Sequence, residues 1–270
     1  MLINYLHKIT NLIFWQFRKK NFVNIDNDET AYALNSLEKD SYFIYKNFLN
    51  SNEIKNIKTK LQIYRKTNKS SEMSSIYFRS RTSVSLDQNY IKIYTDSDIV
   101  KKVSQNFFNI PVEIEKCTYE TKKGLKEQKD ISEEDLQDFE EHLYHIDRGY
   151  GVLKFCLFLN DINIQNGPFC IIPGSHKWSA NFRNFFYRLF HFFIEGRNDK
   201  ISHSNIHKYF NKSDEKKLVG KAGDLLIVNT GAFHRATGMK VNSTREFFLI
   251  YSKAPNYLSL LKKKILKKNQ

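Results

Sequence analysis

The segment VLKFCLFL, at residues 152–159, is the feature that most constrains the fold. Nearly every side chain in it is apolar, so it lacks the alternation of a strand with one solvated face. A strand of this kind must be covered on both faces. An Asn-Gly-Pro turn at residues 166–168 and a second apolar run at residues 169–172 follow it. The middle of the chain therefore predicts buried strands joined by tight turns.

Further strands and two helices are indicated on either side. Residues 112–121, 225–229 and 245–252 are typical of strands, whereas residues 50–64 and 98–108 carry apolar side chains at helical spacing. Asn50 and Glu53 supply a start signal for the first helix. A chain of 270 residues can form one domain with a substantial core. We expect a mainly β sandwich or barrel with helical additions.

The net charge of +14, from 43 Lys and Arg against 29 Asp and Glu, allows nucleic acid or anionic lipid as a partner. No basic helix or aromatic-basic strand of a nucleic-acid reader is present, so we expect a lysine-rich solvated surface and no nucleic acid. Cys117, Cys156 and Cys170 form no C-x-x-C pair. Cys156 and Cys170 lie in apolar runs, which favours buried thiols and a reducing, cytoplasmic location.

The two ends of the chain and one internal segment leave two interpretations open. Residues 1–39 predict an amphipathic helical extension without a signal peptide or membrane span, and residues 254–270 form a basic tail. Residues 177–220 form a lid-like insertion rich in Phe and Arg. These segments either pack on the core or bind peripherally to an anionic membrane surface. The core domain itself is expected at residues 40–253.

A candidate metal site begins with His145 and Asp147. In an extended segment, residues two apart point to the same side and lie roughly 7 Å apart along the chain. His234 follows 87 residues after Asp147. Two histidines and one carboxylate are the ligand set that holds Fe(II) and leaves other positions open. The sequence therefore indicates an iron enzyme, although the spacing of His145 and Asp147 alone is weak evidence.

Arg245, eleven residues after His234, suggests a co-substrate. Its guanidinium can pair with a carboxylate through two parallel hydrogen bonds. If residues 225–234 and 245–252 form an antiparallel hairpin, His234 lies opposite Arg245 with Cβ atoms roughly 5 Å apart. A dicarboxylate that chelates iron would then reach the arginine. The alternative is that His234 is a polar core residue and Arg245 a surface charge.

Several motifs in order resemble the phytanoyl-CoA dioxygenase family over roughly residues 40–253. They are the His145–Asp147 pair, LFLND at 157–161, NGP at 166–168, IIPGSHK at 171–177, Gly223-Asp224, His234 with Arg245, and YFIYKNFLNSNE at 42–53. The resemblance implies a double-stranded β-helix, the cupin-like jelly roll. It also implies an oxygenase that uses Fe(II), 2-oxoglutarate and O2. His145, Asp147 and His234 match the iron ligands, and Arg245 matches the arginine that binds the far carboxylate of 2-oxoglutarate.

The chain departs from the family pattern at the co-substrate. Many members carry a serine two residues after the second histidine, where this chain has Ala236. Thr237 or Tyr119 is therefore expected to supply the remaining contact. His142 lies near the metal motif but out of register with it, and His176 lies in a turn where a structural role is expected. Halogenating members replace the metal carboxylate with a small residue, so Asp147 favours hydroxylation, with succinate and CO2 as co-products.

Two other classes of protein remain open at this level. One is a jelly-roll binding module without activity, and the other is a cupin-type metal enzyme that does not use 2-oxoglutarate. Arg245 distinguishes the second, because such enzymes need no carboxylate clamp. The expected partner is a small-molecule or acyl, lipid-like substrate, partly apolar and anionic, whose identity the sequence does not define.

Overall fold

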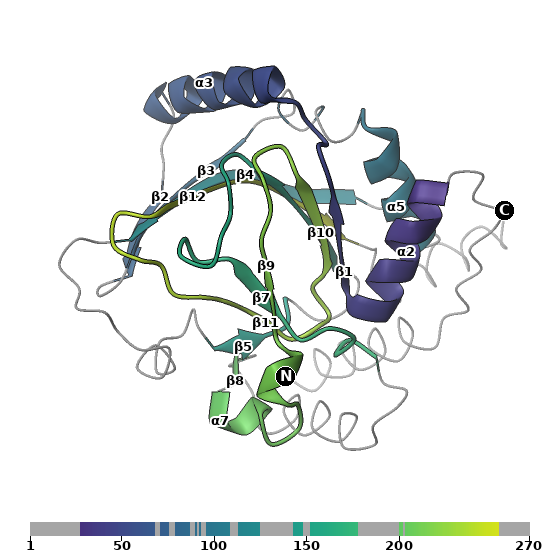
Figure 1. Ribbon diagram of the computed structural model, residues 1–270. Coiled ribbons are helices and arrows are strands. Elements are labelled where there is room, and N and C mark those ends of the chain that lie inside the picture. The colour runs from purple at the N-terminus through teal and green to yellow at the C-terminus, as the bar shows by residue number, and fades with distance from the viewer. Residues whose placement is uncertain are drawn as a thin grey trace, which may run out of the picture.

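The computed structural model describes residues 28–67, 71–75, 79–86, 90, 92, 96–108, 113–124, 143–147, 152–177, 200–201 and 203–253. Within them, two antiparallel sheets face each other (Figure 1). The larger has seven strands in the order β1 Tyr42–Tyr45, β10 Leu225–Asn229, β6 Val152–Phe158, β12 Thr244–Lys253, β4 Glu113–Gly124, β3 Arg79–Ser85 and β2 Ser71–Ser75. The smaller has five in the order β8 Lys200–Ile201, β5 Tyr144–His145, β11 His234–Ala236, β7 Phe169–Ile171 and β9 Lys216–Leu218. This confirms the predicted jelly roll.

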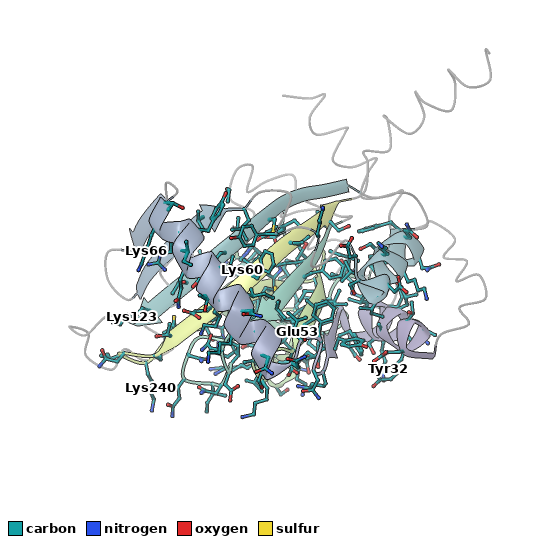
Figure 2. All side chains as sticks on the ribbon, turned by 90° about the horizontal axis from the view of Figure 1, so that it is seen from above. Tyr32, Glu53, Lys60, Lys66, Lys123 and Lys240 are labelled. Carbon is teal, nitrogen blue, oxygen red and sulfur yellow. The ribbon has the colours of Figure 1, made fainter. Side chains whose placement is uncertain are left out.

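Helices cover the outer face of the larger sheet. They are α2 Asp28–Asp40, α3 Ser51–Thr67 and α5 Asp98–Phe108, and a short α7, His203–Ile206, lies at the smaller sheet (Figure 1). Helix α3 crosses the larger sheet with Glu53, Lys60 and Lys66 along its exposed side (Figure 2). Its predicted start is confirmed, because Asn50 Oδ1 accepts from the backbone N–H of Glu53 at 3.1 Å. In return, Glu53 accepts from the backbone N–H of Asn50 at 2.8 Å.

The central strand β6 explains the uninterrupted apolar run. Phe155 and Leu157 belong to the core beneath the helices, whereas Cys156 and Phe158 belong to the core between the two sheets. Both faces of the strand are therefore removed from water, as its composition predicts. The inter-sheet core also contains Phe247, from β12.

The cysteine side chains lie in the interior, as the apolar sequence around Cys156 and Cys170 predicts. Cys117, Cys156 and Cys170 are buried and form no disulfide. Among the described residues, no helix is both long and apolar enough to cross a membrane. Of the predicted extension at residues 1–39, the structure describes residues 28–39, which belong to α2 and pack into the helix-side core through Leu34 and Leu37.

Other expectations fall on residues outside the described ones. These are residues 1–27, most of the insertion at 177–220, the tail at 254–270 and His142. The proposed contact with an anionic membrane depends on the first three of these segments. It stays a prediction.

The predicted hairpin between the strands of His234 and Arg245 is wrong. Strand β10 pairs with β1 and β6, while β12 lies between β6 and β4. His234 begins β11, which belongs to the other sheet and pairs with β5 and β7. The chain crosses from one sheet to the other between Asn229 and His234, and crosses back before Thr244. Arg245 therefore lies opposite Lys122 of β4 rather than opposite His234.

Candidate metal centre

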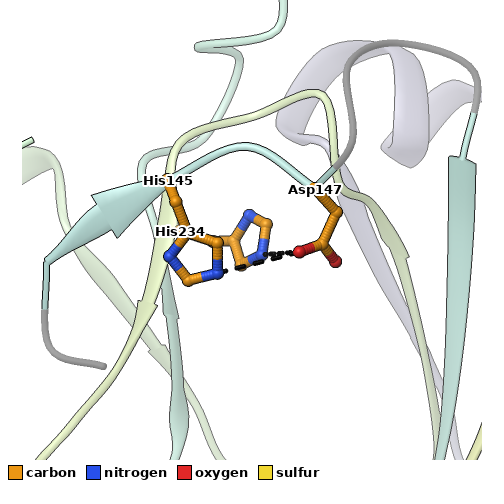
Figure 3. A group of neighbouring side chains, drawn as sticks. All are labelled: His145, Asp147 and His234. Atoms are coloured by element: carbon orange, nitrogen blue, oxygen red, sulfur yellow. Dashed lines mark ion pairs between the residues drawn. The ribbon is translucent and has the colours of Figure 1, made fainter. Parts of the chain in front are cut away.

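Two short neighbouring strands bring the predicted metal ligands together. His145 ends β5 and His234 begins β11, and the two residues are direct partners in the antiparallel register. Asp147 follows β5, where its backbone N–H donates to the carbonyl of Thr230 at 3.2 Å. The possible ligand atoms of His145, Asp147 and His234 all lie within 4.8 Å of one another (Figure 3). The structure therefore gathers residues that the sequence separates by almost ninety positions.

Backbone carbonyls orient both imidazole rings. His145 Nδ1 is 3.1 Å from the carbonyl oxygen of Leu143, and His234 Nδ1 is 2.9 Å from that of Ala232. Because a carbonyl only accepts, each Nδ1 carries a proton, and each ring presents its Nε2 to the cluster. Phe169 stacks on His234, with 4.9 Å between ring centroids. Both Nε2 atoms approach Asp147 Oδ1, at 3.7 Å from His145 and 3.6 Å from His234.

The electrostatics of the cluster fit a divalent cation. Burial and the neighbouring His234 lower the pKa of His145 to about 3, so its ring is neutral. Burial raises the pKa of Asp147, but Lys154 and His234 outweigh it and hold that pKa well below its usual range. His234 Nε2 is buried and has no hydrogen-bond partner among the described residues. A neutral imidazole at His145 and an ionised carboxylate at Asp147 are protonation states that a metal requires of its ligands.

A second charged group lies on the inner face of the larger sheet. Arg245 is buried, with its guanidinium 4.8 Å from the ring centroid of Phe247 and Nη2 4.0 Å from Glu120 Oε1. The same Glu120 oxygen is 3.3 Å from Nζ of Lys122, which is also buried. Phe247 belongs to the inter-sheet core, so Arg245 points into the space between the sheets, as His234 does. We did not anticipate Lys122 or Glu120 from the sequence.

Tyr119 and Thr237, the other predicted co-substrate contacts, have protein partners of their own. Tyr119 packs in the helix-side core, on the opposite face of β4 from Glu120, and its hydroxyl donates to Glu246 at 3.5 Å. Thr237 is buried immediately after β11, and its hydroxyl donates to the Pro168 carbonyl at 2.8 Å. His176 is buried against the hydroxyl of Ser41, an arrangement in line with the structural role expected for it.

The outer face of the ligand strands carries a buried ion pair. Arg235 follows His234 on β11 but points the other way, and its Nη2 donates to Glu215 Oε2 at 2.9 Å. The Arg235 guanidinium lies 5.3 Å from the ring centroid of Tyr144, the residue before His145. His207 Nε2 is 3.1 Å from the other oxygen of Glu215. These contacts connect the described part of the 177–220 insertion to the outer face of β5 and β11, the strands that carry His145 and His234.

We expect Arg235→Met to lower the free energy of unfolding by about 3–5 kcal/mol, because it leaves the Glu215 carboxylate buried without its partner. Burial raises the pKa of Glu215, but Tyr144 and Arg235 outweigh this and lower it to about 2. Since this pKa is depressed on folding, the stabilisation is present above the ordinary pKa of 4.5 and disappears as the pH falls through about 2.

Urea unfolding at neutral pH and near pH 3 would measure both effects. The double variant Arg235→Met/Glu215→Gln is the control, because it removes both charges and should lose less stability than the two single variants added together. An Arg235→Met protein within about 1 kcal/mol of the original would mean that the pair contributes no more than an exposed one.

Solved structures resemble this fold at low sequence identity. The epimerase SnoN from nogalamycin biosynthesis, in complex with Fe3+, alpha ketoglutarate and nogalamycin RO, has a TM-score of 0.57 at 12% identity, over 86% of this chain and 89% of that chain. HygX from Streptomyces hygroscopicus, with nickel, 2-oxoglutarate and hygromycin B bound, has 0.51 at 14% identity, over 86% and 88%. The carbocyclase SnoK, also from nogalamycin biosynthesis, has 0.51 at 12% identity, over 82% and 83%. At these identities the likeness shows the fold alone.

A comparison of the amino-acid sequence with known families identifies the family of this chain. No curated protein matches this chain. The profile of the phytanoyl-CoA dioxygenase family matches residues 37–247, well over half of the 270 residues. The matched range runs from the end of α2 into β12 and includes His145, Asp147, His234 and Arg245. The chain therefore belongs to the phytanoyl-CoA dioxygenase family.

Proposed function

We propose that this protein is an Fe(II)- and 2-oxoglutarate-dependent dioxygenase that hydroxylates a small-molecule or acyl, lipid-like substrate, with 2-oxoglutarate converted to succinate and CO2. The observation that carries the proposal is that the possible ligand atoms of His145, Asp147 and His234 lie within 4.8 Å of one another, with the His145 ring neutral and the Asp147 carboxylate ionised. These residues would hold Fe(II), which supplies the activation of O2 when bound. The family membership and the 2-oxoglutarate-bound relatives support the same chemistry.

The second part of the proposal assigns the co-substrate to Arg245 and Lys122. These two buried cations both lie near the carboxylate of Glu120 in the core. A carboxylate that enters beside them would interact favourably with both positive charges, and more strongly at the low dielectric of a buried site. Arg245 can take such a carboxylate through two hydrogen bonds, and Lys122 can add a third. Lys122 thus takes the role that we expected of Tyr119 or Thr237.

The residues around the site have a further role in excluding water. Phe158 and Phe247 stack on each other with ring centroids 5.3 Å apart, and both are buried in the inter-sheet core. Phe169 stacks on His234 and Phe247 lies against the Arg245 guanidinium, so both groups have apolar neighbours. A dry site strengthens the pairing of a carboxylate with Arg245, because charges interact more strongly at low dielectric.

Hydroxylation is the outcome that we favour, because the chain keeps the carboxylate ligand Asp147. Two solved structures of similar fold are described instead as an epimerase and a carbocyclase, so epimerisation and ring closure are the alternative reactions to test. The relatives that contain nogalamycin RO or hygromycin B make a small molecule the favoured substrate class for this chain too.

Anaerobic addition of Fe(II), followed by 2-oxoglutarate, O2 and panels of candidate substrates, would test the proposal. We expect succinate in proportion to a product that gains one oxygen atom. A product of unchanged mass would indicate epimerisation, and loss of two hydrogens would indicate ring closure. Absence of 2-oxoglutarate binding in the iron-loaded protein would contradict the proposal and favour a cupin-type enzyme or a binding module.

A further inference from the structure

A buried lysine lies beside the carboxylate of the candidate metal centre. Lys154 interrupts the apolar run of β6, and its side chain is 14% exposed. Its Nζ lies 3.4 Å from Asp147 Oδ2 and stands over the rings of Tyr251, at 4.9 Å, and Phe169, at 5.6 Å. An ammonium group in such a position needs a compensating carboxylate, and Asp147 provides one.

The two oxygens of Asp147 have different neighbours. Oδ1 faces Nε2 of both His145 and His234, at 3.7 and 3.6 Å, whereas Oδ2 accepts the hydrogen bond from Lys154. A carboxylate can bind a divalent cation through one oxygen or through both. In a centre with three protein ligands, the second mode would fill a position that must stay open for the co-substrate.

We propose that Lys154 is a positioning residue that holds Oδ2 of Asp147, so that this carboxylate offers a metal one oxygen only. The inference rests on the proposed Fe(II) site. Lys154 keeps the remaining positions free for a chelating 2-oxoglutarate, and it does so without touching either the metal or the co-substrate.

The position of Lys154 along the sheet separates this role from that of a co-substrate clamp. Lys154 lies opposite Tyr251 on β12, six residues from Arg245. Six residues of an extended strand span about 20 Å of backbone, so Lys154 of β6 and Arg245 of β12 start from well-separated backbone positions. Their side chains have different partners: Lys154 donates to the carboxylate ligand Asp147, whereas Arg245 lies near Glu120.

The test compares Lys154→Met and Lys154→Arg with a matched control, Lys221→Met. Lys221 is an exposed lysine whose ion pair with Asp161 lies at the surface, so the control removes the same charge away from the site. Each protein is loaded with Co(II), whose visible absorption weakens as the coordination number rises, and is then titrated anaerobically with 2-oxoglutarate. Thermal unfolding of each variant shows whether it is folded.

In the Lys154→Met protein we expect weaker Co(II) absorption and about tenfold weaker binding of 2-oxoglutarate, because the co-substrate must then displace Oδ2 of Asp147 from the metal. The Lys154→Arg and Lys221→Met proteins should match the original in both. If Lys154→Met does not fold, Lys154→Gln replaces it and should change both quantities in the same direction.

An unchanged Co(II) spectrum in the folded neutral variant would overturn the proposal, as would complete loss of Co(II) binding, because Asp147 must still be a ligand. The comparison of Co(II) spectra needs no turnover and no 2-oxoglutarate. The Lys154 proposal can therefore be contradicted by these spectra even if the original protein still forms succinate. Conversely, a protein that binds Co(II) but never consumes 2-oxoglutarate would contradict the proposed function and leave the role of Lys154 to be judged from the spectra.

Discussion

Replacement of His145, Asp147 or His234 by alanine is expected to abolish tight Fe(II) binding and turnover while leaving the fold largely intact. Each change removes one of three side chains whose ligand atoms lie within 4.8 Å of one another. Few other contacts depend on them: His234 loses one hydrogen bond to the backbone and its stacking on Phe169. A stability loss of about 1–2 kcal/mol is expected from either histidine change, too little to unfold a typical domain. The Asp147→Ala change should cost more, because it leaves Lys154 without its carboxylate.

Anaerobic Fe(II) titration and thermal unfolding would measure the two effects separately. His176→Ala is the matched control, because His176 is also a buried histidine but lies away from the cluster, against Ser41. The His176→Ala protein should have a lower melting temperature and should still bind iron. Asp147→Asn should accompany Asp147→Ala, since alanine leaves Lys154 without any polar partner at that side chain. Full activity in any one of the three alanine variants would overturn the site assignment.

Arg245→Lys should raise the KM for 2-oxoglutarate by about 10- to 100-fold, with a smaller effect on kcat. An ammonium group keeps the charge but cannot form the two parallel hydrogen bonds of a guanidinium. Loss of a hydrogen bond between charged groups costs about 1.5–3 kcal/mol, which corresponds to this range. Steady-state kinetics with varied 2-oxoglutarate would measure it, and an unchanged KM would mean that another cation is the clamp.

Two neighbouring substitutions sharpen this test because they should act in opposite directions. Lys122→Met removes a cation from the group and should weaken 2-oxoglutarate binding. Glu120→Gln removes the anion that both cations share and should strengthen it. Equal weakening in both variants would show that Glu120 only holds Lys122 and Arg245 in place and does not compete with the co-substrate.

Local patterns in the sequence were sufficient to predict strands β1, β4, β6, β7, β10 and β12, helices α3 and α5, and His145 and Asp147 as candidate metal ligands. The apolar run of β6 predicted a buried strand, because both faces of that strand are covered. The start of α3 could be predicted because Asn50 and Glu53 are only three residues apart in the chain. His145 and Asp147 are equally local. His234 could be predicted as a ligand only because a second histidine completes a known ligand set and because the order of the motifs resembles that of a family.

Contacts that depend on strand pairing could not be predicted in this way. Eleven residues between His234 and Arg245 suit a hairpin, but here the chain uses them to change sheets. In β4 the ordinary expectation is that Tyr119 faces the interior and Glu120 faces water. Tyr119 is indeed buried, but under the helices, and Glu120 is buried between the sheets. Because both faces are covered, alternation alone does not say which face carries the site.

The strands that carry the two histidines are very short, and this has a consequence for local stability. β5 has two residues and β11 has three, and they meet at a single residue pair, His145 with His234. A metal held by both histidine side chains would cross-link β5 and β11, which backbone pairing joins at one residue pair only. Its binding free energy would therefore add to the rigidity of the five-stranded sheet, whereas the seven-stranded sheet is packed on both faces, by the helix-side core and by the core between the sheets.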